Sequence, residues 1–298
     1  MIYTVTFNPA IDYVVGCEKL CAGEINRADR EEIFFGGKGI NVSLVLNELG
    51  VKSKALGFVA GFTGKAIEDG VRAQGVETDF VHLDSGFSRI CVKIKADEET
   101  EINGAGPKIS HSAIQSLFNK LSLLKSGDTL ILAGSIPKSL PNDMYERILA
   151  FIDGKGVRTV VDAAGDLLLK VLKYKPFMVK PNNFELGDMF GVRLESIDDV
   201  IKYAEKLKEM GAENVLVSMA ADGSVLVDEN GEIHRCGVCN GTVINSVGAG
   251  DSMVAGFVAG CEKGYDYALK LGTAAGGATA FSSGLAKGKD IIALLETL

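Results

Sequence analysis

The sequence of 298 residues lacks tryptophan altogether and contains only three histidines and six prolines. The histidines, at positions 82, 111 and 234, share no spacing, so they do not indicate a catalytic or metal-binding group. No apolar run approaches the roughly 20 residues needed to cross a bilayer. The first twelve residues also lack the basic and apolar regions of a secretory signal. We therefore expect a soluble, cytoplasmic protein with no membrane partner.

Basic clusters are also missing. The formal net charge is -8, and nucleic acids and anionic membranes both require a positive surface. These partners are therefore not expected. An anionic small molecule would have to be bound by local cations inside a cleft, because the overall field of the chain repels it.

Six cysteines are present, and two of them, Cys236 and Cys239, lie close to His234. A structural zinc site usually shows two such close ligand pairs. The other close pair, Cys17 and Cys21, lies far away in the sequence. Reduced structural thiols are therefore favoured over a metal site.

Short β-rich runs alternate with helical stretches along the chain. This alternation is typical of an α/β protein with a mostly parallel sheet covered on both faces. We predict strands at 3–7, 54–59, 129–133, 159–162, 177–180, 214–218 and 224–228, the last continuing through a hairpin turn into 232–236. We predict helices at 40–49, 65–74, 112–124, 142–153, 197–210, 250–262 and 267–282. No repeat or linker divides the chain, so a single domain of residues 1–298 is expected.

Two segments, residues 13–35 and 88–102, do not fit this alternation. Both read as extended, and residues 89–95 (Arg-Ile-Cys-Val-Lys-Ile-Lys) alternate with the period of two that is typical of strands. We predict that they form a small β-sheet that lies over one edge of the main sheet as a lid.

Residues 35–42, Phe-Gly-Gly-Lys-Gly-Ile-Asn-Val, lead from an extended segment into a predicted helix. Glycines let backbone N–H groups approach a ligand closely. Lys38 adds a positive charge, and Asn41 adds an amide. A tight strand-to-helix turn would explain one of the glycines, but it does not explain the presence of Lys38 and Asn41. A ligand-binding loop is favoured.

Residues 245–251, Asn-Ser-Val-Gly-Ala-Gly-Asp, open another predicted helix. The free N–H groups of Ala249, Gly250 and Asp251 would form an anion-binding site that the helix dipole reinforces. The carboxylate of Asp251 could then accept a hydroxyl proton during phosphoryl transfer. Alternatively, Asp251 is an acidic residue that stabilises a helix N-terminus.

Asn182 and Glu185 follow a predicted strand and lie three residues apart at a helix start. Both side chains could face one polar site and hold a hydrated Mg²⁺ ion. A helix cap with an acidic third residue explains the same pattern equally well.

Together these motifs resemble those of the ribokinase/PfkB carbohydrate kinases. Residues 36–41 are similar to the N-terminal signature of that family, residues 248–251 to its C-terminal signature, and Asn182-x-x-Glu185 to its magnesium motif. The order and spacing also match, over essentially the whole chain. One departure is that Asn245-Ser246-Val247 stands where many members have Asp-Thr. The resemblance implies a ribokinase-like three-layer α/β/α fold, with ATP and Mg²⁺ as cofactors.

The resemblance also implies residue roles. Asp251 would be the general base, with Gly248, Ala249 and Gly250 as the anion hole. The sugar phosphate would be bound by Asp12, Arg27, Gly36, Gly37, Lys38, Asn41 and Arg89. The nucleotide would be bound by Lys180, Ser218, Ala220, Ala221, Asp222, Gly223, Gly248 and Gly250, and the metal by Asn182 and Glu185.

Three further segments, 39–43, 61–69 and 100–107, resemble the branch that acts on fructose 1-phosphate. The implied reaction is the conversion of fructose 1-phosphate and ATP to fructose 1,6-bisphosphate and ADP. Tagatose 6-phosphate and fructose 6-phosphate stay open as acceptors, because ketohexose furanoses are nearly symmetric end to end. A non-catalytic sugar-phosphate sensor with the same fold is a further alternative, and a homodimer formed through the exposed edge of the lid is conceivable.

Overall fold

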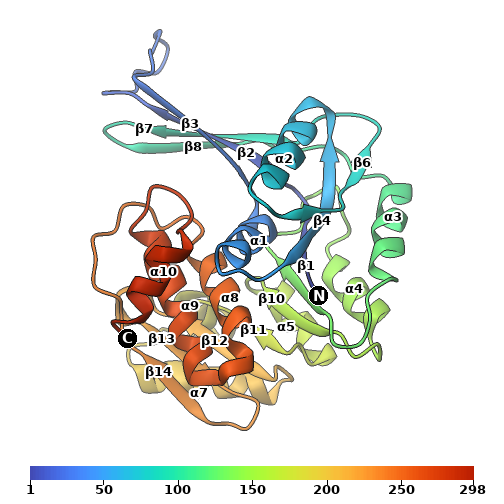
Figure 1. The fold of residues 1–298 in the computed structure, drawn as a ribbon, viewed down its shortest axis with the longest axis vertical. Coiled ribbons are helices and arrows are strands. Elements are labelled where there is room, and N and C mark those ends of the chain that lie inside the picture. The colour runs from blue at the N-terminus through green and yellow to red at the C-terminus, as the bar shows by residue number, and fades with distance from the viewer.

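The computed structural model describes all 298 residues and is built around a ten-stranded sheet (Figure 1). The strand order is β14-β13-β12-β11-β10-β9-β1-β4-β5, and β6 also pairs with β4. All neighbours are parallel except for the hairpin strands β13 and β14 at one edge. The bounds are β1 Ile2–Thr6, β4 Ser53–Ala60, β5 Glu77–Thr78, β6 Val81–Leu83, β9 Thr129–Ala133, β10 Arg158–Asp162, β11 Met178–Val179, β12 Asn214–Ser218, β13 Ser224–Val227 and β14 Ile233–Cys236.

Apolar side chains line both faces of the central strands. Along β9, Leu130 and Leu132 point into one hydrophobic cluster, and Ile131 points into another on the opposite face. All three are fully buried. Continuous apolar runs of this kind are expected for parallel strands covered on both sides, so the sheet forms the middle of three layers.

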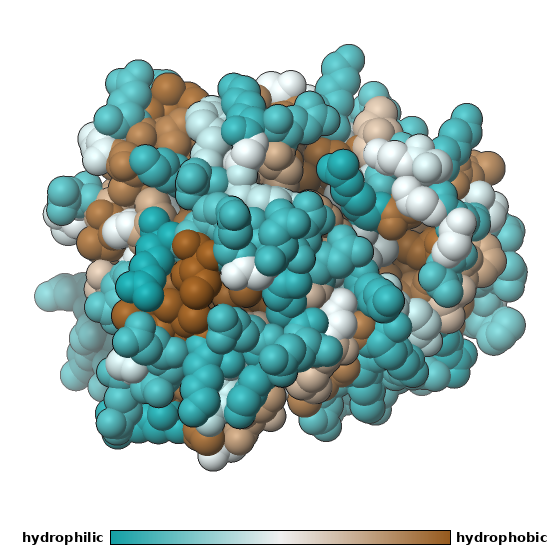
Figure 2. Space-filling model, turned by 90° about the horizontal axis from the view of Figure 1, so that it is seen from below, coloured by the Kyte–Doolittle hydropathy of each residue, from teal (hydrophilic) through white to brown (hydrophobic).

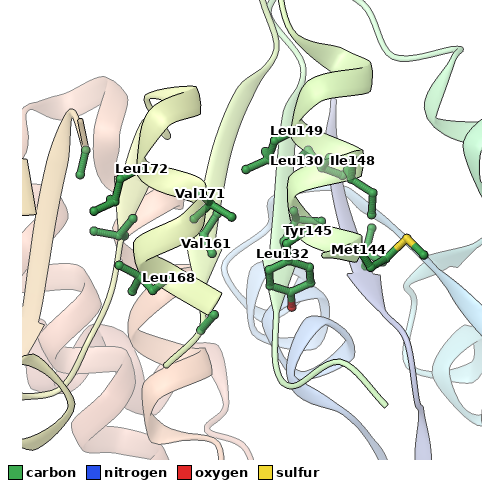
Figure 3. Packing of buried hydrophobic residues seen from close by; sticks show 14 of the residues in the cluster. Leu130, Leu132, Met144, Tyr145, Ile148, Leu149, Val161, Leu168, Val171 and Leu172 are labelled. Carbon is green, nitrogen blue, oxygen red and sulfur yellow. The ribbon is translucent and has the colours of Figure 1, made fainter. Parts of the chain in front are cut away.

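One helical layer consists of α3 His111–Leu121, α4 Met144–Ile152, α5 Asp166–Val171, α6 Asn183–Phe190 and α7 Ile197–Glu209. Figure 3 shows how α4 and α5 pack against β9 and β10 through Tyr145, Ile148, Leu168 and their neighbours. The buried Tyr145 donates its hydroxyl to the carbonyl of Gly134 over 2.8 Å. This contact ties the helix layer to the loop that follows β9.

The other helical layer consists of α1 Lys38–Glu48, α8 Ala249–Gly260, α9 Tyr265–Ala280 and α10 Gly288–Leu295. Glycines allow α8 and α9 to approach closely, since a Cβ on Gly256 would lie 2.5 Å from the carbonyl oxygen of Leu271. Helix α2, Gly61–Ala73, packs beside α1 against β4. Helices α1 and α8 therefore begin side by side above the same edge of the sheet, where the ligand motifs lie.

A separate four-stranded sheet, called the second sheet below, projects from this body (Figure 1). Its order is β3-β2-β7-β8, with bounds β2 Ala10–Gly16, β3 Arg30–Gly36, β7 Arg89–Lys95 and β8 Glu99–Asn103. The inner pair β2 and β7 is parallel, and each outer strand joins antiparallel. Strands from two distant parts of the chain thus form one sheet.

The three-layer α/β/α architecture with a mostly parallel sheet is as predicted, and most predicted elements are present. Helix α2 begins at Gly61, four residues earlier than expected, because β4 runs into it directly at Ala60. The extended segment near residue 13 begins at Ala10 and is interrupted between Gly16 and Arg30. Helices α5 and α10 and the short strands β5 and β6 were not predicted, since each is brief and lacks a clear period.

The face of the molecule that points away from the second sheet is mostly hydrophilic, with hydrophobic residues in separate patches (Figure 2). None of the helices has both the length and the apolar character that crossing a bilayer would require.

Candidate active site

A cavity of about 410 Å³ lies between the carboxyl ends of the central strands and one face of the second sheet. Its lining brings together twelve of the residues predicted from sequence, namely Asp12, Gly37, Lys38, Asn41, Arg89, Lys180, Asn182, Glu185, Ser218, Gly248, Gly250 and Asp251. Seven further residues, which the sequence did not single out, complete it: Ala10, Cys91, Lys93, Glu101, Asn103, Asp162 and Val247. Most of these side chains are polar or charged.

The end of this cavity next to the central sheet, called the core end below, is organised around Asp162. This residue is the last of β10, and its side chain is only 3% exposed. Lys180 Nζ lies 3.3 Å from one of its oxygens, and Lys38 Nζ lies 3.5 Å from the other. That second oxygen, Oδ2, is buried and accepts no hydrogen bond. Asp162 therefore forms ion pairs with two lysines at the carboxyl end of the sheet, while its Oδ2 stays without a hydrogen bond.

Asp251 lies in the first turn of α8 and is buried, with 4% of its surface exposed. Asn41 Nδ2 donates a hydrogen bond of 2.8 Å to its Oδ2. Burial, together with repulsion from Asp162, raises the pKa of Asp251 to about 7, although Asn41, Lys38 and Lys180 oppose that rise. A carboxyl group with a pKa near neutrality is well matched to accepting a proton.

The N-terminus of α8 presents two free N–H groups where three were predicted. The Ala249 N–H donates to the carbonyl of Ser246 over 3.2 Å, so it is engaged in the turn. The N–H groups of Gly250 and Asp251 have no acceptor in the protein. Gly248 precedes them with a φ of 83°, a left-handed conformation that favours glycine. The prediction was thus wrong for Ala249, because the tight turn uses its donor.

Helix α1 begins directly after Gly37, whose φ is 125°. A Cβ at this position would lie 2.5 Å from Cγ2 of Thr6, so the loop can pack against β1 only with glycine here. Thr6 also accepts a hydrogen bond from the Ile40 N–H through its hydroxyl. This packing places Lys38 and Asn41 at the core end, where Lys38 faces Asp162 and Asp251. The carboxylates of Asp162, Asp251 and Glu185 outweigh the effect of burial and raise the pKa of Lys38, so it stays charged.

The opposite end of the cavity, called the second-sheet end below, contains Asp12, Arg89, Lys93 and Glu101. Asp12, which the resemblance implied as a sugar-phosphate contact, lies within β2 of the second sheet. Burial raises its pKa, and the charges of Lys93 and Arg89 oppose this rise. Arg89 donates from Nε to the carbonyl of Asn8 over 3.0 Å, which leaves the rest of its guanidinium available.

Asn182 and Glu185 form a capping box at the start of α6. Asn182 Oδ1 accepts from the Glu185 N–H over 2.8 Å, and Glu185 Oε2 accepts from the Asn182 N–H over 2.9 Å. The helix-cap alternative is therefore real, but it uses only one carboxylate oxygen of Glu185. Both residues also line the cavity, so the two interpretations are compatible.

Several predicted site residues lie outside this cavity. Arg27 is on an exposed loop between β2 and β3. Ala220, Ala221 and Asp222 form an exposed single turn after β12, and the buried Gly223 follows them. Gly36 lines a larger neighbouring cavity of about 950 Å³, which also shares Asp12, Asn41, Lys93 and Val247 with the first.

The cysteines are all free thiols, as expected. His234 contacts carboxylates rather than cysteines: Nδ1 lies 2.6 Å from Asp266 and Nε2 lies 3.2 Å from Asp228. Burial raises the pKa of Cys239 to about 11, so this thiol is unreactive near neutral pH.

The two ends of the cavity complement each other chemically. The core end offers a base, two cations and two free N–H donors, which is the equipment for moving a phosphoryl group onto a hydroxyl. The second-sheet end offers a carboxylate and two cations that could bind a polar, anionic acceptor.

Comparison with known proteins agrees with this geometry. The profile described as pfkB family carbohydrate kinase matches residues 2–291. The 1-phosphofructokinase of Bacillus subtilis is 47% identical over 287 residues, covering 96% of this chain and 94% of that protein. The D-tagatose-1-phosphate kinase of Bacillus licheniformis is 37% identical over 288 residues, with coverage of 96% and 94%.

Solved structures show the same architecture. Phosphofructokinase-2 from Escherichia coli, in complex with substrates and products, superimposes with a TM-score of 0.92 at 25% identity and covers 100% of this chain and 99% of its own. Ribokinase from Arabidopsis thaliana superimposes with a TM-score of 0.80 at 20% identity, with coverage of 99% and 98%. The predicted ribokinase-like fold is confirmed.

Proposed function

The chain belongs to the pfkB family of carbohydrate kinases, and we propose that it transfers the γ-phosphoryl group of ATP to fructose 1-phosphate, forming fructose 1,6-bisphosphate and ADP. The observation that carries this proposal is the buried Asp251 beside two free N–H groups, across one cavity from Arg89 and Asp12. The name of the relative in Bacillus subtilis supports the choice of acceptor.

In the proposed reaction, Asp251 accepts the proton of the sugar hydroxyl. The hydroxyl oxygen forms a bond to the γ-phosphorus as the bond from that phosphorus to the bridging oxygen breaks, and ADP leaves with the bonding electrons. The N–H groups of Gly250 and Asp251 and the ammonium groups of Lys38 and Lys180 are close enough to stabilise charge on the transferred group. Because such transition states are loose, this stabilisation contributes more than the strength of the base.

The core end also fits a magnesium ion. Its donors are oxygens of carboxylates and an amide, which Mg²⁺ prefers, and Asp162 Oδ2 is buried without a hydrogen-bond partner. Asn182, Glu185 and Asp162 would hold the ion through water. When bound with ATP, the ion supplies neutralisation of phosphate charge.

The nucleotide would extend from the core end toward β12. Ser218 lines the cavity there, and the exposed turn of residues 220–222 lies immediately beyond it. We assign this turn and Gly223 to nucleotide binding as part of the same proposal.

The proposed requirement for magnesium has a direct test. Removal of divalent cations with a chelator should abolish ADP formation, and added Mg²⁺ should restore it.

The second sheet would act as the lid of this site. The face that carries Asp12 and Arg89 lines the cavity, so closure over a bound sugar would exclude water and limit ATP hydrolysis. A measurable test is the ratio of ATP hydrolysis to sugar phosphorylation. Shortening the loop between Gly16 and Arg30 should not raise this ratio, whereas removing strands β7 and β8 should.

Pairing of two chains through the second sheet is part of the proposal. Its outer strands are unpaired at their edges, and Ile33 on β3 and Ile102 on β8 are 57% and 60% exposed. Exposed apolar residues on an open sheet favour association. The substitution Ile33→Asp should convert a dimer to a monomer in light scattering after size exclusion; a wild-type monomer would contradict this part.

The acceptor is best tested with a panel of fructose 1-phosphate, fructose 6-phosphate, tagatose 1-phosphate and tagatose 6-phosphate, compared by kcat/KM. The highest value is expected for fructose 1-phosphate. A higher value for either tagatose phosphate would favour the activity named for the relative in Bacillus licheniformis. If no panel member causes ADP release, a non-catalytic sugar-phosphate sensor becomes the better interpretation.

A further inference from the structure

The register of the second sheet directs a row of cations from β7 toward the site. Alternate residues of a strand share a face, so Arg89, Cys91, Lys93 and Lys95 all lie on one side. The first three line the 410 Å³ cavity. Lys93 lies opposite Val14 on β2 and Glu101 on β8. Two residues earlier on the same face of β7, Cys91 lies opposite Asp12.

Lys93 is the cation of this row that lies farthest from an acceptor, since Arg89 and Lys95 each have an oxygen within 3.0 Å. The Lys93 side chain is only 12% exposed. The nearest carboxylate oxygens, on Asp12 and Glu101, are each 3.9 Å away. An ammonium has three donors, and those of Lys93 have no acceptor of the protein within hydrogen-bonding distance. They are therefore available to a ligand that enters the cavity.

Lys95, two residues further along β7, provides the contrast. Its Nζ lies 2.8 Å from Glu99, the residue opposite it on β8, and its side chain is 33% exposed. It lines the larger neighbouring cavity and not the 410 Å³ one. The two lysines share a strand, a face and a charge, but only Lys93 is directed into the site without a close partner.

The charges at the second-sheet end explain why this lysine matters. Asp12 and Glu101 carry two negative charges, and Arg89 and Lys93 carry two positive charges. A sugar phosphate brings nearly two more negative charges at neutral pH. Without Lys93 the group would be net negative before the ligand arrived, and it would repel the ligand. Lys38 and Lys180 cannot compensate, since both are held at the core end by Asp162.

We propose that Lys93 binds the phosphate group already present on the sugar substrate and thereby makes the enzyme selective for phosphorylated over unphosphorylated sugars. This inference rests on the function proposed above and adds to it a residue and a basis for selectivity. With the acceptor hydroxyl at Asp251, the phosphate lies toward β7, where Arg89 and Lys93 donate to its oxygens from the same face.

The test compares three variants: Lys93→Met, which keeps the length and the apolar stem; Lys93→Arg, which restores the charge; and Lys95→Met, the matched control. For Lys93→Met, the KM for fructose 1-phosphate should rise about 10- to 100-fold, the range expected for a lost hydrogen bond to a charged group. Its kcat and its KM for ATP should stay near wild type. Lys93→Arg should recover most of the affinity, and Lys95→Met should resemble wild type.

Selectivity provides a second readout that a purely structural role would not move. The ratio of kcat/KM for fructose 1-phosphate to kcat/KM for fructose should fall in Lys93→Met by the same factor as the rise in KM. An equal loss for both sugars, or a Lys93→Met variant that behaves like Lys95→Met, would overturn the inference while leaving the proposed function intact. A wild-type enzyme that phosphorylates no member of the sugar phosphate panel would overturn both.

Discussion

The two ends of the cavity are built in different ways. At the core end, Asp162 is the last residue of one buried parallel strand and Lys180 follows another. Asp251 and Asn41 lie in the first turns of packed helices, and most of these side chains are nearly inaccessible. At the second-sheet end, Asp12, Lys93 and Glu101 project from mid-strand positions and Arg89 begins β7, in a four-stranded sheet that is open on its other face. Glu101 there is 39% exposed.

This difference has a chemical consequence. Burial couples the charges of the core end strongly, so that Asp162 shifts the pKa of Asp251 and determines where Lys38 and Lys180 lie. The second-sheet end is held by cross-strand register in a separate sheet. Under the proposed function, a rigid core end would stabilise the transition state, and the second sheet would admit and cover the substrate. Substitutions at the core end should therefore change kcat, and those at the second-sheet end should change KM.

The largest effect is expected from Asp251→Asn, which removes the proposed base and keeps the side-chain shape. The value of kcat should fall about 10²- to 10⁴-fold, the usual contribution of a general base, with little change in the KM for either substrate. Steady-state ADP release measures both constants. Asp290→Asn in the first turn of α10 is the matched control, as this acidic residue is exposed at a helix start outside the cavity. Comparable activities of the two variants would mean that Asp251 only stabilises the N-terminus of α8 and is not the base.

The second effect concerns Arg89→Met at the other end. Loss of a guanidinium that faces an anionic substrate should raise the KM for the sugar phosphate about 10- to 100-fold, with kcat reduced far less. Initial rates over a range of sugar phosphate concentrations test this. A fall in kcat with an unchanged KM would contradict the expectation that substitutions at the second-sheet end change KM.

A smaller effect concerns pH. Because the pKa of Asp251 is raised to about 7, the carboxyl group is protonated below that pH and cannot accept a proton. The value of kcat/KM should therefore fall about tenfold for each pH unit below 7. In Asp162→Asn, repulsion on Asp251 is lost, its pKa decreases, and the acid limb should move to lower pH. If the acid limb of the pH profile of Asp162→Asn stays in place, after normalisation to the plateau rate, the two carboxyl groups are not coupled.

The smallest effects are on stability. Leu132→Ala in the buried strand β9 should cost about 2–5 kcal/mol of unfolding free energy, as usual for a fully buried leucine. Val92→Ala on the half-exposed outer face of β7 should cost about 1 kcal/mol or less. Chemical denaturation of both variants measures the difference. Equal losses would indicate that the second sheet folds as tightly as the body and cannot act as a movable cover.

Contiguous motifs carried most of what could be predicted. The loop of residues 36–41, the turn of residues 248–251 and the pair Asn182 and Glu185 each place their chemistry within a few residues. Local backbone preferences, such as those of Gly37 and Gly248, then determine their shape. The alternation of strands and helices likewise predicted three layers, since parallel strands buried on both faces leave a recognisable apolar pattern.

Residues that act through neighbours distant in the chain could not be predicted. Asp162 appeared only as the last residue of a strand, and its contacts with Lys38 and Lys180 depend on the order of β9, β10 and β11 and on the position of α1. The Ala249 N–H looked free because its partner, the Ser246 carbonyl, becomes an acceptor only when the turn closes. The sheet that carries Asp12 could not be predicted either, because no local signal shows where the chain leaves one sheet for another.

The sequence by itself thus determined which groups this protein offers: a carboxyl group at a helix N-terminus, a glycine loop with a cation, and the layered fold that supports them. The tertiary structure alone decided how the charges are shared. It grouped Lys38 and Lys180 around Asp162 and turned Lys93 into the cavity while Lys95 pairs with Glu99. The period of two along β7 places both lysines on one face, but only the packing of the second sheet over the body decides which of them lines the 410 Å³ cavity.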